Sequence, residues 1–209
     1  MEEIVRNLAN TIGLNLSYDK EKIDVIAYGL TAIVQMLMIF LIVSVIGIFF
    51  NTWFESFIIF ILVGLLRKST GGAHNATFMG CLIYSIFFIS IMALLSRYLA
   101  NDCLVIFYAV FSGIIFVWAL YITYKKVPVD SPNKPISKKT TIKRLRRNSF
   151  LTLVLYAIST AILFVFSDIN IRYVSFALSI SISVLWQTFM LTDIGDRFIK
   201  IIDCKMVDF

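Results

Sequence analysis

Residues 24–50 have the sequence DVIAYGLTAIVQMLMIFLIVSVIGIFF, and after Asp24 no charged residue occurs before Glu55. About 20 apolar residues in a helix cross the hydrocarbon core of a bilayer, because an α-helix rises about 1.5 Å per residue. This stretch therefore predicts a membrane-spanning helix, and it sets the class of fold expected for the rest of the chain.

The composition of the whole chain agrees with this prediction. Of its 209 residues, 59% are hydrophobic and 15% are charged, whereas a soluble domain has about 25% charged residues. The net charge is +6, but the basic residues cluster between apolar segments, which is the pattern of the positive-inside rule. No basic patch interleaved with aromatic residues occurs. We therefore expect lipid, and not nucleic acid, around this protein.

Five further apolar segments follow the first one, and the second of the six is unusually short. It has only about 14 residues, roughly 21 Å of helix, and Glu55 near its start is expected to be an interfacial charge. The sequence predicts an all-α integral membrane protein with about six transmembrane helices in a single polytopic domain over 1–209. The predicted spans are 24–50, 53–66, 78–96, 104–124, 149–167 and 171–191.

The lead-in at residues 1–22 allows two interpretations. Ile4, Leu8 and Ile12 recur every four residues and give one apolar stripe on a helix. The segment is then either a short helix on the membrane surface or a frayed start to the first span.

The topology follows from the basic loop at residues 125–147, KKVPVDSPNKPISKKTTIKRLRR, which has a single acidic residue. Such a loop is expected to be cytoplasmic. Counting spans back places the loop at 67–77 on the same side, and six spans place both termini in the cytoplasm. If the second span is re-entrant instead, the N-terminus lies outside.

The polar break RKSTGGAHNAT at residues 67–77 contains His74, the only histidine, and Cys81 follows it by seven residues. On one helix these two would be about 10.5 Å apart along the axis, too far for a hydrogen-bonded pair. His74 must therefore leave the helix, and Gly71 and Gly72 make such a reversal possible. Cys81 would then lie near a helix N-terminus, whose partial positive charge favours the thiolate.

A structural interpretation of the same residues remains open: a cysteine in an apolar span is often a small buried hydrophobe, and a loop histidine is often solvated. One histidine and three cysteines without a CxxC motif predict no metal site, no cofactor and no disulfide framework. Cys103 and Cys204 are expected to have no catalytic role.

Arg67 followed by Gly71-Gly72-Ala73-His74 and then Cys81 resembles the accessory gene regulator B family, AgrB, the membrane cysteine endopeptidases of Gram-positive quorum sensing. The proline-bounded loop PVDSPNKPI resembles that family too, in Pro128, Asp130, Asn133, Lys134 and Pro135. Asn75 departs from the family, where the residue after the histidine is often small. Chain length and hydropathy agree, so the resemblance covers nearly the whole chain.

The resemblance implies a thiol protease of the cell membrane that cuts the C-terminal segment from an AgrD-like autoinducing-peptide precursor. Cys81 would form a thioester and His74 would exchange protons, after which the peptide closes to a thiolactone or lactone. The family also suggests a homodimer. Substrate-binding or loop-positioning roles are expected for Arg67, Gly71, Gly72, Asn75, Asp130 and Lys134. The alternative is a small-peptide transporter or export channel, against which the near absence of charges inside the spans argues.

Overall fold

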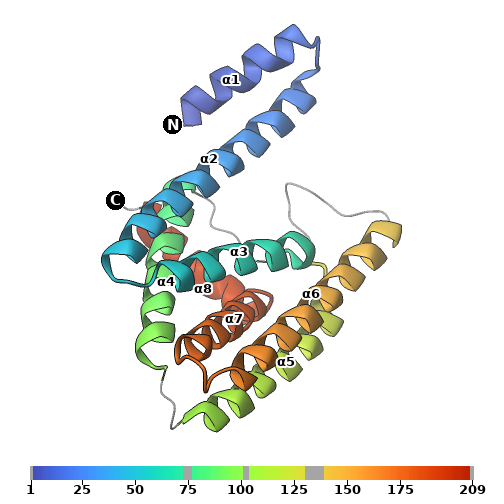
Figure 1. Ribbon diagram of the computed structural model, residues 1–209. Coiled ribbons are helices and arrows are strands. Elements are labelled where there is room, and N and C mark those ends of the chain that lie inside the picture. Colours follow the sequence, from blue (N-terminus) through green and yellow to red (C-terminus); the bar gives the residue numbers. More distant parts are fainter. Residues whose placement is uncertain (1, 73–76, 101–103, 130–138, 208–209) are drawn as a thin grey trace. The chain divides into compact units, whose positions relative to one another are not determined.

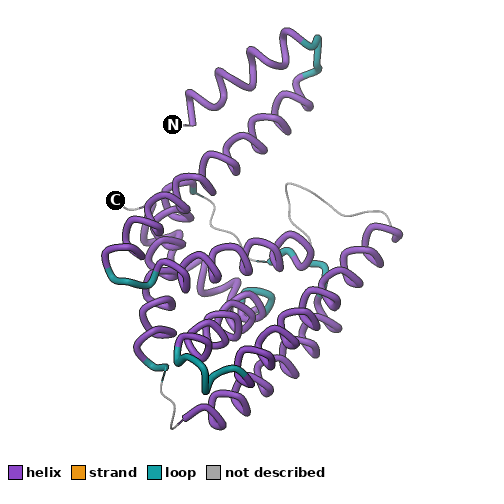
Figure 2. Tube along the Cα trace, viewed as in Figure 1, coloured by secondary structure: helices purple, strands orange, loops and turns teal. Residues whose placement is uncertain are grey.

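The computed structural model describes residues 2–72, 77–100, 104–129 and 139–207, and the described residues form helices joined by turns, with no strand (Figures 1 and 2). The eight helices of this described part are α1 (Glu2–Asn15), α2 (Lys20–Phe49), α3 (Trp53–Thr70), α4 (Phe78–Tyr98), α5 (Val105–Lys126), α6 (Lys139–Val165), α7 (Arg172–Phe189) and α8 (Asp193–Val207).

The prediction of an all-helical membrane protein is confirmed. Among the described helices, four or five are long and apolar enough to span a membrane, so the predicted number of about six is approximate. Four of the described helices qualify alone: α2, α4, α5 and α6. A fifth span results if α7 and α8, which meet at an 87° bend, count as one. The predicted second span corresponds to α3, which carries Glu55 in its first turn and Arg67 and Lys68 in its last.

The basic loop is shorter than the sequence predicts, because α6 begins at Lys139 and not near residue 149. The residues between these two positions include Lys143, Arg144, Arg146 and Arg147. Lysine and arginine are good helix formers, so the spanning helix continues beyond its apolar part as a basic extension.

The chain divides into two compact units, Met1–Ile42 and Val43–Phe209, with the boundary inside α2. In the first unit, α1 is fully helical, which favours the surface-helix interpretation over the frayed one. Gly13 lies against Ile23 of α2, where a Cβ on the glycine would come within 2.3 Å of the isoleucine side chain. Ile4 and Leu8, from the predicted apolar stripe, are exposed, as expected for a helix that binds a membrane surface.

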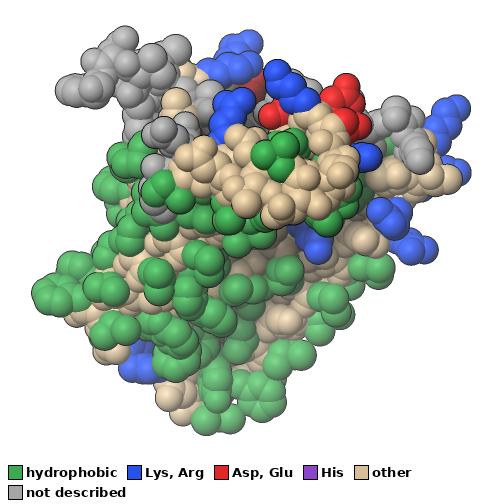
Figure 3. Space-filling view, turned by 90° about the horizontal axis from the view of Figure 1, so that it is seen from above, with side chains coloured by type: hydrophobic (Ala, Val, Ile, Leu, Met, Phe, Trp, Pro, Cys, Tyr) green, Lys and Arg blue, Asp and Glu red, His purple; other side chains and the backbone are tan. Residues whose placement is uncertain are grey.

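In the second unit, α7 is the central helix, with contacts to α3, α4, α5 and α6 (Figure 1). Eleven of its 18 residues are buried. The main hydrophobic core joins four helices through residues such as Leu66, Phe116, Leu153 and Val184. Many large hydrophobic side chains stay exposed instead, and Figure 3 shows how they crowd the surface. Lipid would solvate these side chains.

One polar face of α7 packs along α3, and the two helices run parallel. Ser175 near the start of α7 donates a hydrogen bond to Glu55 near the start of α3, and Gln187 near the end of α7 donates to Thr70 at the end of α3. Small hydroxyl side chains allow helices to approach closely in a membrane. This parallel pairing fixes which ends of the two helices lie together.

Glu55 was expected to be a charge at the membrane–water interface. It is instead buried within the protein, with an exposed fraction of 3%. It accepts a hydrogen bond from Ser175 Oγ at 2.6 Å, and Arg97 Nη1 lies 4.0 Å away. Charges buried in a protein interior are normally paired or hydrogen-bonded, and these two partners explain why an acidic residue is compatible with the interior of this protein.

Candidate active site

Cys81 is half-buried in the first turn of α4, where the sequence predicts it. Thr77 caps this helix: its hydroxyl oxygen accepts a hydrogen bond from the Gly80 N–H at 3.1 Å, and its carbonyl accepts one from the Cys81 N–H at 3.1 Å. The Cys81 sulfur lies 4.0 Å from Ser85 Oγ, one turn further along. Because the N-terminus of a helix favours negative charge, this place suits a nucleophilic thiolate.

The Gly71–Gly72 turn follows directly on the end of α3, and both residues have positive φ angles, +74° and +121°. A Cβ on Gly71 would lie 2.3 Å from the Val129 carbonyl oxygen, so this position excludes every other residue for steric and conformational reasons. Gly72 has only ordinary contacts around its Cβ position, at 3.4 Å or more. Its φ angle alone favours glycine there.

Two loops that are far apart in the sequence meet at this turn. The Val129 N–H, at the entrance of the predicted basic loop, donates a hydrogen bond to the Thr70 carbonyl at 2.9 Å. Lys126, at the end of α5, forms an ion pair of 2.6 Å with Asp193 at the start of α8. The glycine turn and the basic segment therefore lie at the same end of the unit, as the expected topology requires.

Arg67 is half-buried in the last turn of α3. The Gly71–Gly72 turn follows that helix end directly, so Arg67 lies at the end of α3 from which the chain continues toward Cys81.

An aromatic cluster holds α4, α7 and α8 together beyond the first turn of α4. Phe88 stacks on Trp186 with ring centroids 3.9 Å apart, and Tyr84 lies 5.6 Å from Trp186. Phe198 of α8 closes the cluster at 6.3 Å from Tyr84. These contacts fix the first half of α4 against the last turns of α7.

Several predicted residues lie outside the described part of the chain: His74, Asn75, Asp130, Lys134 and Cys103, together with the side chain of Cys204. The structure thus brings Gly71, Gly72 and Arg67 to one end of the unit, and it places Cys81 at the start of the helix that follows. Within the described residues, no group of three or more His, Cys, Asp or Glu side chains could hold a metal ion.

Sequence reasoning missed three residues of this region: Thr77, Thr70 and Gln187. Thr77 had a recognisable signal, since a threonine directly before an apolar run is a typical N-cap. Gln187 had a weaker one, as a polar residue inside an apolar segment. Thr70 had none, because its partners Val129 and Gln187 are distant in sequence.

Fold and site together define a class, the helical membrane proteins that carry a thiol in the first turn of a helix just after a glycine turn. Within that class the chain belongs to the accessory gene regulator B family, AgrB, whose model matches residues 5–191. This membership links the protein to the peptide processing of accessory gene regulator quorum sensing.

Individual relatives agree with the family. A protein of Clostridium perfringens strain SM101, named AgrB-like, is 32% identical over 206 residues, which cover 97% of this chain and 96% of the relative. AgrB-like protein 2 of Clostridium perfringens strain 13 is also 32% identical, over 210 residues with the same coverage. An AgrB-like protein of Clostridium beijerinckii is 30% identical over 68% of this chain and 71% of its own length. No solved structure matches the chain.

Proposed function

We propose that this protein is a cysteine endopeptidase of the cell membrane that processes an AgrD-like autoinducing-peptide precursor. The observation that carries the proposal is the position of Cys81, half-buried in the first turn of a capped helix, in a chain of the AgrB family. The N-terminus of α4 would favour the thiolate form of Cys81, and the Gly71–Gly72 turn leads in sequence into the segment with His74.

The chemistry begins with attack of the Cys81 thiolate on a backbone carbonyl carbon of the precursor. The C–N bond breaks, His74 returns the thiol proton to the leaving amine, and the C-terminal fragment departs. The N-terminal part stays on Cys81 as a thioester. An internal cysteine or serine of the peptide then attacks the thioester carbonyl, which closes a thiolactone or lactone and restores the Cys81 thiol. A site at the edge of the bilayer limits the competing attack by water.

Other residues would act in binding or positioning. Arg67 would hold a carboxylate of the precursor or orient the glycine turn, while Asn75 or Asp130 would orient His74. The basic segment with Lys134 would attract an acidic precursor tail. Raising the salt concentration should then increase KM, because salt screens exposed charges. A KM that is the same at low and high salt would exclude this electrostatic contact.

We propose that the protein works as a homodimer with its processing end in the cytoplasm. Both termini are cytoplasmic as well if α3 crosses the bilayer, which gives the six spans that the sequence predicts. The experiment that tests the function is precursor processing in membranes, with wild type beside Cys81→Ala, Cys81→Ser and His74→Ala. Wild type should release a C-terminal fragment and form a hydroxylamine-sensitive adduct that requires Cys81. If all four proteins process the peptide alike, the Cys–His pair has a structural role and the export function takes precedence.

A further inference from the structure

Gln187 is a buried amide at the end of α7, with an exposed fraction of 1%. Its Nε2 donates hydrogen bonds to Thr70 Oγ1 at 2.9 Å and to the Gly71 carbonyl at 2.8 Å. The Thr70 hydroxyl can donate its own hydrogen to the Leu66 carbonyl at 3.0 Å or to the Gly71 carbonyl at 3.2 Å. Because both partners accept, the orientation of the amide is determined: the NH₂ group must face the glycine turn.

The rest of the same α7 face behaves differently. Ser183 and Ser179 lie one and two turns before Gln187 on the surface that packs along α3, and each hydroxyl donates to a carbonyl of α7 itself. Such bonds satisfy the hydroxyl within its own helix and do not link α7 to a neighbouring helix. Gln187, by contrast, uses both of its donors on the end of α3.

Packing alone does not account for this amide. Gln187 Oε1 is buried and has no hydrogen-bond partner among the described residues. A buried acceptor without a partner destabilises the folded protein, and an apolar side chain of similar length would not have this cost. The two bonds to the turn are what the glutamine adds.

The turn itself is held from two sides. Val129 binds the Thr70 carbonyl and crowds the Cβ position of Gly71, while Gln187 binds the Gly71 carbonyl. The chain leaves this clamp at Gly72, two residues before His74 in the sequence. The direction of the Gly71 peptide therefore sets where the segment joining α3 to α4 begins.

We infer that Gln187 is a positioning residue for peptide processing: by fixing the Gly71 carbonyl it orients the start of the segment that carries the general base relative to Cys81. This inference rests on the proposed function. Proton transfer between a thiol and its base depends on distance, and a misplacement of about 1 Å can cost roughly 100-fold in rate. Gln187 would thus affect kcat while leaving precursor binding unchanged.

The test compares Gln187→Met, which keeps length and burial but removes both donors, with Ser183→Ala on the same face of α7. Processing of the precursor is measured in membranes, as kcat and KM per amount of inserted protein. Gln187→Met should lower kcat about 10- to 100-fold with KM within about twofold of wild type. Ser183→Ala should retain the wild-type kcat.

Thr70 supplies a second route to the same conclusion, including the case in which Gln187→Met fails to insert. Thr70→Val removes the hydroxyl that Gln187 binds and should lower kcat, and Thr70→Ser should restore it. When both single variants insert, the double variant should lose less than the product of their separate effects, because the residues act as one unit.

A wild-type kcat in Gln187→Met, or a loss in Thr70→Val that Thr70→Ser shares, would overturn the inference while the proposed function stands. If wild type itself releases no fragment from the precursor, the proposed function fails instead. The two failures are therefore distinguishable in one assay.

Discussion

At the residue scale, Gly71 is the position in the described part of the site where a side chain is least compatible with the structure. Its φ of +74° is unfavourable for any side chain, and a Cβ would lie 2.3 Å from the Val129 carbonyl oxygen, which is backbone and has no rotamer to change. We expect Gly71→Ala to abolish precursor processing, because the turn and the Val129 segment would have to separate. Processing and inserted protein are both measured by immunoblot of membranes.

The control for Gly71→Ala is Gly64→Ala in the preceding helix α3, where nothing lies within 4 Å of the added Cβ. This variant should process the precursor as wild type does, and the helix itself should gain slightly, since alanine is favoured over glycine by about 1 kcal/mol. Wild-type processing by Gly71→Ala would mean that the turn relaxes at no cost, and the geometric role given to the glycine would be wrong.

The sequence anticipates residues of this site only where a local pattern carries the information. A cysteine at the start of an apolar run after a Gly-Gly pair predicts a thiol in the first turn of a helix, and Cys81 is there. The hydrogen bonds of Gln187 join residues separated by more than 100 positions. No periodicity encodes such a contact, because it results from the parallel packing of α3 and α7.

At the element scale, hydropathy predicted the long spans well, since one apolar run of sufficient length determines each of them. The hydropathy prediction was wrong where a helix contains charged residues. The start of α6 is basic and helical, and α3 carries a buried acid whose partners come from α7 and α4. A hydropathy profile predicts that Glu55 lies at the membrane–water interface, because it does not include tertiary contacts such as those with Ser175 and Arg97.

The α3–α7 pairing makes a prediction about stability. Ser175→Ala removes the hydroxyl that donates to Glu55 at 2.6 Å and leaves a buried carboxylate with the distant Arg97 alone. Hydrogen bonds to charged groups contribute roughly 1.5–3 kcal/mol, so the thermal unfolding midpoint in detergent should fall by several degrees.

Ser179→Ala is the matched control for this prediction. Ser179 is equally buried on the same face, but its hydroxyl bonds to the Ser175 carbonyl within α7. Its loss should change the midpoint little. Equal midpoints for the two variants would show that the Ser175–Glu55 bond contributes nothing measurable to the packing of α3 on α7.

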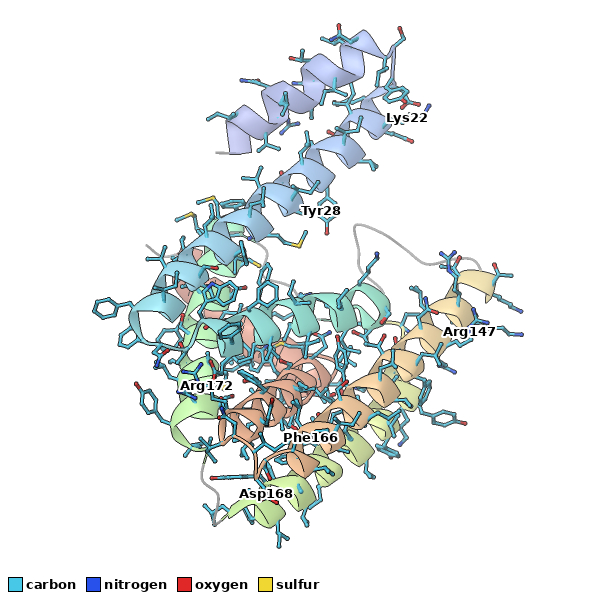
Figure 4. The ribbon with its side chains drawn as sticks, in the orientation of Figure 1. Lys22, Tyr28, Arg147, Phe166, Asp168 and Arg172 are labelled. Atoms are coloured by element: carbon cyan, nitrogen blue, oxygen red, sulfur yellow. The ribbon has the colours of Figure 1, made fainter. Side chains whose placement is uncertain are left out.

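At the scale of the whole molecule, the orientation in the membrane depends on which end of the bundle faces the cytoplasm. The hydrogen bond from Val129 to Thr70 places the glycine turn beside the basic segment, so one experiment on the ends of α6 reports on both loops. Figure 4 shows Arg147 toward the first end of α6, with Phe166 and Asp168 at its other end. The excess of lysine and arginine at the first end predicts that this end is cytoplasmic.

The measurement uses Lys139→Cys and Asp168→Cys, each in a chain whose three native cysteines are replaced by serine, and a membrane-impermeant maleimide. Both positions are exposed. In intact cells Asp168→Cys should be labelled and Lys139→Cys protected, and permeabilisation should make both reactive. Labelling of Lys139→Cys in intact cells would show that the topology is the reverse of the predicted one. The thiol of Cys81 would then face the outside, and a precursor made in the cytoplasm would have to cross the membrane before it could be cut.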